Sequence, residues 1–186
     1  KSGSAAAQIS RARSTAASAA SVLPRSRSTF VRSSSTSGSA GSSRVDVIPL
    51  LQELVRMREK AGSKPVPVLS CESLAFDVRA DTNQMLAIFG HLVQNAQDAT
   101  GDDGRIEIIQ STEDGQLVLE FRDSGHGMDE EFIKNQLFKP FKSTKGKGMG
   151  IGVYETKEII HALGGSIDVE STPGQGSCFT IKLPKA

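Results

Sequence analysis

The sequence contains no tryptophan, one tyrosine, two cysteines and three histidines among its 186 residues. So few aromatic side chains argue against a stacking platform for single-stranded nucleic acid. The two cysteines, Cys71 and Cys178, cannot form a disulfide framework, and they share no metal-ligand spacing with a histidine. We therefore expect free thiols in a protein of the reducing cytoplasm.

Long apolar runs are also absent. No run approaches the ~20 residues that cross a bilayer, and residues 1–30 lack the continuous apolar core of a secretory signal. We therefore expect no membrane contact by this chain itself, although a longer parent protein can be anchored in the inner membrane.

Charge is divided unevenly along the chain. Residues 1–45 hold seven basic residues and no acid, which leaves 15 basic against 21 acidic residues in the remainder. Residues 1–44 also contain 15 serines and nine alanines but few large apolar side chains, too little apolar surface to offset the entropy lost on folding. We expect residues 1–44 to be disordered, and a folded domain over 45–186. A basic tail can bind phosphates non-specifically, but no specific nucleic-acid partner is expected.

The remaining sequence alternates helical and strand patterns. Asp81 and Gln84 form a plausible capping box for a long central helix, and period-2 apolar residues mark several strands. Helices are predicted at 48–62, 82–101, from about 129, and at 151–163; strands are predicted at 65–70, 73–78, 105–110, 116–123, 166–171 and 177–184. This order predicts an α/β two-layer sandwich, with a mixed sheet and helices packed on one face.

Two clusters carry polar residues on apolar elements. Asn95, in NAQDAT, lies on an otherwise apolar helix face, and its amide oxygen suits a hard cation such as Mg²⁺. Asp123 opens DSGHGM at the end of an apolar strand, where its carboxylate can accept from an exocyclic amine. Gly125 and Gly127 allow the sharp bends that bring a planar ligand close to the backbone.

Two further clusters follow. Phe138 and Phe141, in LFKPF, can anchor a mobile loop on the core. GKGMGIG (146–152) precedes a helix, so its backbone N–H groups can hold phosphate oxygens, although it lacks the GK[ST] ending of a Walker loop. Taken singly, the four clusters also fit a helix-end amide, an ordinary turn, core packing and a flexible linker.

In this order and spacing, the clusters resemble the ATP-binding domain of sensor histidine kinases, the Bergerat (GHKL) fold shared with gyrase, Hsp90 and MutL. NAQDAT resembles the N box, DSGHGM the first glycine box, LFKPF the F box and GKGMGIG the second glycine box. The short lid FKSTKGKGMGIG is similar to that of the nitrogen-regulation branch. GHLVQNAQDAT and GMGIGVYETKEIIHALGG are similar to orphan kinases associated with exopolysaccharide and PEP-CTERM systems.

The resemblance implies roles for the matching residues. Asn95 would hold Mg²⁺ at the ATP phosphates and, with Lys145, form the catalytic pair; Asp123 would accept from the adenine amino group, supported through water by Ser177. The other ATP-binding residues that the resemblance implies are Asp98, Gly125, Gly127, Met128, Phe138, Phe141, Ser143, Thr144, Lys145, Gly146, Gly148, Met149 and Gly150. Gly152 departs from the family, in which alanine or serine is common.

Kinase and hydrolase members of this superfamily differ one helical turn before the Mg²⁺ asparagine. Hydrolases carry a glutamate there that activates water, whereas this chain has His91, which either lines the pocket or contacts phosphate. The resemblance therefore favours transfer of the γ-phosphate to a histidine. A standalone ATPase and a nucleotide-dependent interaction module are the alternatives.

The partners follow from the same resemblance. Sensor kinases carry their phosphoacceptor histidine on an upstream dimerising hairpin, and no histidine precedes His91 here. The expected partners are such a hairpin, normally in the same polypeptide, and a response regulator. Residues 1–44 occupy the place of the hairpin, and we interpret them as a genuine disordered segment or as an out-of-frame translation of a GC-rich gene.

Overall fold

The computed structural model describes residues 43–72, 75–140 and 152–186. The elements follow one another as β1 (Ser43–Asp46), α1 (Val47–Lys60), β2 (Val68–Cys71), β3 (Asp77–Ala80), α2 (Thr82–Ala99), β4 (Ile106–Glu113), β5 (Gln116–Asp123), α3 (Glu130–Phe132), the π-helix η1 (Ile133–Leu137), α4 (Gly152–Ala162), β6 (Ser166–Thr172) and β7 (Gly176–Pro184). Predictions about residues 1–42 lie outside the described residues.

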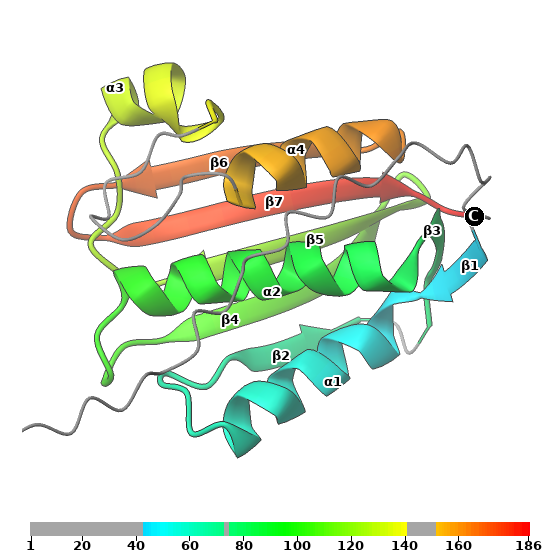
Figure 1. Cartoon of the computed structure of the whole chain (residues 1–186), viewed down its shortest axis with the longest axis horizontal. Coiled ribbons are helices and arrows are strands. Elements are labelled where there is room, and N and C mark those ends of the chain that lie inside the picture. Colours follow the sequence, from blue (N-terminus) through cyan, green and yellow to red (C-terminus); the bar gives the residue numbers. More distant parts are fainter. Residues whose placement is uncertain (1–42, 73–74, 141–151) are drawn as a thin grey trace, which may run out of the picture. The chain divides into compact units, whose positions relative to one another are not determined.

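A five-stranded sheet with the order β2-β4-β5-β7-β6 forms one layer. β2 runs parallel to β4, and the other neighbouring strands are antiparallel. The helices α1, α2 and α4 lie together on one face of this sheet, as Figure 1 shows. The predicted two-layer sandwich with a mixed sheet is therefore confirmed.

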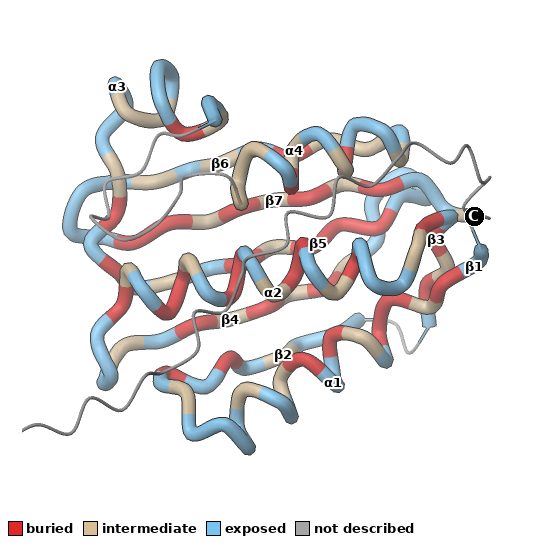
Figure 2. Tube along the Cα trace, viewed as in Figure 1, coloured by how far each residue is buried: buried red, intermediate tan, exposed pale blue. Residues whose placement is uncertain are grey.

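The core residues lie on the helices and on the sheet that they cover, and Figure 2 marks buried positions in red. Along β5, every second side chain faces the helices, and these are the buried Leu117, Leu119 and Phe121. The centroid of the Phe121 ring lies 5.9 Å from that of Phe89 on α2. Each such buried side chain contributes about 1.5–3 kcal/mol of transfer free energy. Because side chains alternate along a strand, Asp123 points to the same face as these core residues, beyond the end of the apolar packing.

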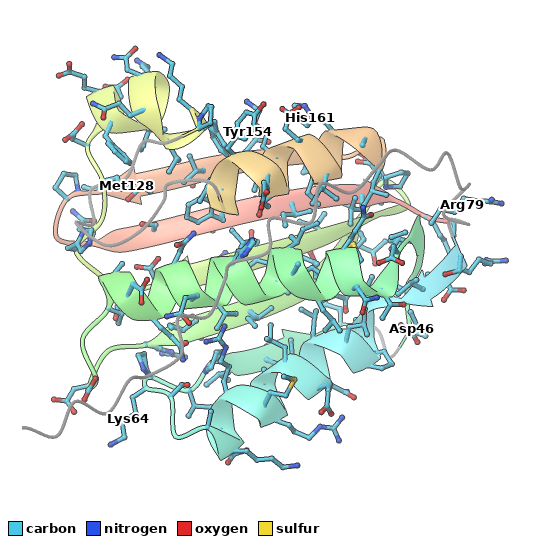
Figure 3. All side chains as sticks on the ribbon, viewed as in Figure 1. Asp46, Lys64, Arg79, Met128, Tyr154 and His161 are labelled. Carbon is cyan, nitrogen blue, oxygen red and sulfur yellow. The ribbon has the colours of Figure 1, made fainter. Side chains whose placement is uncertain are left out.

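The first elements differ from those predicted. β1 was not among the predicted strands, and β2 and β3 belong to different sheets, since β3 pairs with β1 in a separate two-stranded sheet. Asp46, labelled in Figure 3, joins this region to the helices: its Oδ1 accepts from the backbone N–H groups of Ile48 (3.1 Å) and Phe76 (3.2 Å). It therefore caps α1 and fixes the approach to β3 with one carboxylate.

The last residue of the chain joins the small sheet. The Ala186 N–H donates to the Asp77 carbonyl at 2.9 Å, and the Arg44 guanidinium donates to the Ala186 carbonyl at 3.4 Å. Residues 44 and 186 therefore meet beside β1 and β3. Among the described helices, none combines the length and the apolar character needed to cross a membrane.

Candidate functional site

The turn after β5 is held in one conformation by hydrogen bonds at both of its ends. Asp123 ends β5, and its Oδ1 accepts from the Gly125 N–H at 2.8 Å. Ser124 and Arg105 bond reciprocally: the Ser124 N–H donates to the Arg105 carbonyl at 3.0 Å, and the Arg105 N–H donates to Ser124 Oγ at 2.8 Å. The half-buried Asp123 carboxylate is thereby fixed beside a glycine backbone.

This turn packs closely against two other elements. A Cβ on Gly125 would lie 2.5 Å from the Ala99 carbonyl oxygen, at the end of α2, and the His126 N–H donates to that oxygen at 3.0 Å. A Cβ on Gly127, which has a φ of +66°, would lie 2.0 Å from the Thr172 carbonyl oxygen on β6. Neither position has room for a side chain, so the two predicted glycines let α2, the turn and the β6–β7 hairpin converge.

Two serines line the hairpin side of the turn. Ser177 stands opposite Asp123 in the β5–β7 register. Ser171 stands opposite Ser177 with their Oγ atoms 3.0 Å apart, and Ser171 Oγ accepts from the Met128 N–H at 2.8 Å. Figure 3 labels Met128 at this end of the molecule.

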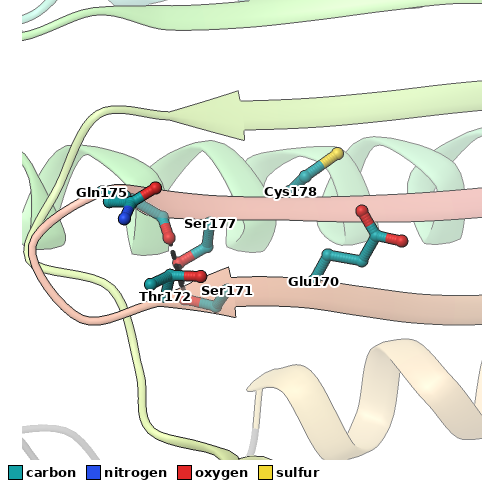
Figure 4. A pocket seen from close by; sticks show the side chains of 7 residues that line it. Glu170, Ser171, Thr172, Gln175, Ser177 and Cys178 are labelled. Atoms are coloured by element: carbon teal, nitrogen blue, oxygen red, sulfur yellow. Dashed lines mark hydrogen bonds between the residues drawn. The ribbon is translucent and has the colours of Figure 1, made fainter.

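Ser171 was missed by sequence reasoning. A signal was present, because Ser171 follows Ile167 and Val169 in the inward-facing phase of β6 and is polar where an apolar residue is expected. An open pocket of about 210 Å³ beside these serines is shown in Figure 4. Among the described residues that are predicted to bind ATP, Ser177 alone lines it.

Asn95 lies on α2, half-buried, two residues after the buried Val93. His91 and Asp98 occupy the same side of the helix at helical spacing, and both are exposed. A Cβ on Gly152, the first residue of α4, would lie 3.4 Å from the Cγ of His91. The start of α4 therefore meets α2 one turn before Asn95.

Phe138 lies half-buried after η1 and packs against the core. The Lys157 ammonium on α4 lies 4.5 Å from the centroid of its ring, in a cation–π contact. Other predicted residues of this region lie outside the described residues: Phe141, Ser143, Thr144, Lys145, Gly146, Gly148, Met149 and Gly150.

The donor atoms of the site suit a nucleotide whose cation takes only some of its ligands from the protein. Among residues 43–72, 75–140 and 152–186, no group of three or more His, Cys, Asp and Glu side chains could hold a metal ion. A single amide oxygen at Asn95 is instead the kind of ligand that Mg²⁺ accepts while phosphates and water complete its shell. The Asp123 carboxylate can accept a hydrogen bond from an exocyclic amine.

One buried hydroxyl lies close to the turn. Thr100 follows Ala99 and is 7% exposed, and no described residue bonds its Oγ1. Its Cγ2 would lie 2.1 Å from a Cβ on Gly104, and Ser124 Oγ would lie 3.1 Å from the same point. Thr100 is therefore next to the Asp123 turn.

Comparisons with known proteins find sensor histidine kinases. Sporulation kinase A of Bacillus subtilis is 34% identical over 116 residues, covering 62% of this chain and 19% of its own length. The sensor histidine kinase ZraS of Klebsiella oxytoca is 36% identical over 108 residues, covering 58% of this chain and 23% of its own length. The chain thus spans about a fifth of these curated relatives.

Solved structures give the same fold. The mycobacterial sensor histidine kinase MprB has a TM-score of 0.67 at 19% identity, covering 77% of this chain and 97% of that one. The catalytic domain of the histidine kinase ThkA has a TM-score of 0.67 at 26% identity, covering 77% and 96%. Residues 80–186 match the family model described as histidine kinase-, DNA gyrase B- and HSP90-like ATPase, and the chain belongs to this family.

Proposed function

We propose that this chain binds Mg-ATP and transfers the γ-phosphate to a histidine on a phosphoacceptor hairpin, as the catalytic domain of a cytoplasmic two-component kinase. One observation carries the proposal: the Asp123 turn is wedged between the end of α2, which bears Asn95, and the hairpin that bears Ser177. Three elements that carry predicted groups, far apart in the sequence, thus converge at one end of the sheet in a member of an ATP-binding family.

The adenine end of the site depends on fixed hydrogen-bond geometry. The Gly125 N–H donates a hydrogen bond that holds the Asp123 carboxylate in place. The serine pair Ser171–Ser177 lies on β6 and β7. A carboxylate held in this way accepts from an amine without reorganising when the ligand arrives. We assign Asp123 as the acceptor for adenine, with Ser177 and a water as its support.

The phosphate end depends on Asn95. Mg²⁺, when bound, neutralises charge on the phosphate oxygens. Asn95 would contribute its side-chain oxygen to that ion, with Asp98 close by on the same helix face. Lys145 and the neighbouring glycines and hydroxyls of residues 143–150 would contact the phosphates.

Kinase activity is favoured over hydrolysis at one position. His91 occupies the turn before Asn95, the position at which the hydrolases that this chain resembles carry a water-activating glutamate. The γ-phosphate is therefore left for an external nucleophile. The downstream partner is a response regulator that receives the phosphoryl group from the hairpin.

Phosphoryl transfer in trans tests this function. The protein is mixed with γ-labelled ATP, Mg²⁺ and an isolated phosphoacceptor hairpin from a sensor kinase such as ZraS. We expect label on the hairpin in an acid-labile, alkali-stable bond, which is the signature of phosphohistidine. Asn95→Ala should abolish labelling, whereas Asn83→Ala, which removes an exposed asparagine from the first turn of the same helix, should not.

Two results would contradict the proposal. Absence of Mg-ATP binding by the wild-type protein would remove its basis. Binding accompanied by steady release of inorganic phosphate, with no hairpin labelled, would instead support the ATPase alternative.

A further inference from the structure

Arg58 on α1 holds the outer surface of α2 through three hydrogen bonds. Its Nη1 donates to Gln94 Oε1 at 2.6 Å and to Gln97 Oε1 at 3.1 Å, and its Nη2 donates to the Gly90 carbonyl at 3.1 Å. Positions 90, 94 and 97 form one stripe along α2, since they follow the i, i+4, i+7 spacing of a helix face. A planar guanidinium reaches all three acceptors at once, which a lysine ammonium cannot do with the same geometry.

Each of the two glutamines also donates a hydrogen bond to a second partner. The Gln94 amide nitrogen donates to Asp98 Oδ1 at 2.8 Å, and the Gln97 amide nitrogen donates to the Pro65 carbonyl at 3.0 Å. Each amide therefore has its oxygen on Arg58 and its nitrogen on a second partner, which fixes its orientation. Gln97 is 8% exposed, so loss of Arg58 would leave a buried acceptor without its donor.

This network surrounds the turn of α2 that carries Asn95. Gln94 precedes Asn95 directly, and Asp98 follows it by three residues. The opposite side of the same turn is fixed in the core by Leu92, Val93 and Ala96. The helix is thus held on its core side by apolar packing and on its outer side by Arg58. Together these contacts restrain rotation of α2 about its own axis.

We propose that Arg58 is a positioning residue for the cation and phosphate site, acting through Gln94 and Gln97 on Asn95 and Asp98. The inference rests on the proposed function, in which Asn95 provides an oxygen to Mg²⁺. Magnesium demands near-ideal octahedral geometry, and a misplacement of about 1 Å in an active site can cost roughly a hundredfold in rate. A helix that carries one ligand therefore needs its rotation fixed.

The test compares two arginines of α1. Arg58→Lys retains the charge but loses the planar fork, and Arg56→Lys is the matched control, because Arg56 is exposed and pairs only with Glu53 among the interactions resolved here (3.3 Å). A non-hydrolysable ATP analogue is titrated with saturating Mg²⁺ and with EDTA, Mg²⁺ is titrated at fixed analogue, and urea unfolding is measured in parallel.

We expect Arg58→Lys to weaken the apparent Mg²⁺ affinity of the analogue complex about tenfold, the effect of losing one or two hydrogen bonds from a charged group. Analogue affinity in EDTA should change less than about twofold, since the adenine end is unaltered, and Arg56→Lys should change neither quantity. If Arg58→Lys does not fold, Gln94→Met provides the second variant: it removes the exposed link to Asp98 and should weaken Mg²⁺ affinity in the same direction.

Other outcomes separate the two claims. Loss of stability in Arg58→Lys with unchanged Mg²⁺ affinity would show a purely structural arginine and overturn the inference alone, as would unchanged Mg²⁺ affinity in Gln94→Met. A wild-type protein that binds the analogue without any dependence on Mg²⁺ would overturn the proposed role of Asn95, and the inference with it.

Discussion

At the scale of the residue, the charge of Asp123 is separable from its structural role. An asparagine at this position keeps an oxygen that can accept from the Gly125 N–H, but it loses the negative charge that strengthens a bond to an adenine amine. Asp123→Asn should therefore weaken Mg-ATP binding by roughly tenfold to a hundredfold, equivalent to about 1.5–3 kcal/mol, with little change in stability. Calorimetric titration measures the affinity. Asp168→Asn, an exposed position on β6, is the control, and equal affinities in the two variants would refute the assignment.

Two glycines with left-handed backbones distinguish conformational strain from lack of space. Gly115 (φ +74°) has no atom within 4 Å of an added Cβ, whereas Gly127 (φ +66°) has the Thr172 carbonyl oxygen at 2.0 Å. Gly115→Ala should cost about 1–2 kcal/mol, the penalty of a left-handed alanine. Gly127→Ala should cost clearly more, because the turn and β6 must also separate. Urea denaturation of both variants gives the comparison, and equal losses would contradict it.

At the scale of the element, Lys157 and Phe138 join α4 to the segment that follows η1. Their cation–π contact should contribute about 0.5–1 kcal/mol. A double-mutant cycle with Lys157→Gln and Phe138→Leu isolates this term from the separate losses of packing and charge. We expect a coupling of that size in thermal or urea unfolding, whereas additive effects would mean that the ammonium and the ring do not interact in solution.

Elements with strong local signals could be predicted from the sequence. Asp81 does cap α2, its Oδ1 accepting from the Gln84 N–H at 3.0 Å, and the β4–β5 and β6–β7 hairpins lie where turn residues predicted them. β1 and the pairing of β2 with β4 could not be predicted, because their partners lie more than 30 residues away and short strands take their identity from those partners.

The residues of the candidate site likewise differ in whether the sequence alone could indicate them. Asn95, Asp123 and Ser177 stand out as polar residues next to glycines or on apolar elements, and the structure brings Asp123 and Ser177 opposite one another. Arg58 gave no such signal, since an arginine on an exposed amphipathic helix is ordinary. Its three acceptors all lie on another helix more than 30 residues along the chain.

At the scale of the whole molecule, the ion pair between Glu113 and Lys182 links the end of β4 to β7 across β5. The hydrogen bond and charge of Lys182 lower the pKa of Glu113, and those of Glu113 raise the pKa of Lys182. The unfolded chain binds protons more readily at Glu113 than the folded chain does. Glu113 therefore contributes to the free energy of unfolding above its ordinary pKa, and this contribution disappears as the pH falls through the lowered pKa of the folded state. Lys182 contributes to the free energy of unfolding below its ordinary pKa, and this contribution disappears as the pH rises through its raised pKa in the folded state.

Lys182→Gln should therefore lower the melting temperature slightly at about pH 7, and this difference from wild type should shrink at an acidic pH below the lowered pKa of Glu113. The effect stays small because both groups are exposed to solvent. Differential scanning calorimetry at the two pH values, with Lys64→Gln on an exposed loop as control, measures it. A difference from wild type that is equal at both pH values would show that the pair makes no pH-dependent contribution.

The bonds that join Ala186 to Asp77 and Arg44 have a mechanical consequence. β5 carries Asp123 at one end and reaches Gln116, opposite Pro184, at the other, so the corner where residues 44 and 186 meet lies roughly 25 Å from the Asp123 turn, about one strand length. A disturbance at that corner, such as loss of the bond from Arg44, would therefore reach the Asp123 turn only through the full length of β5.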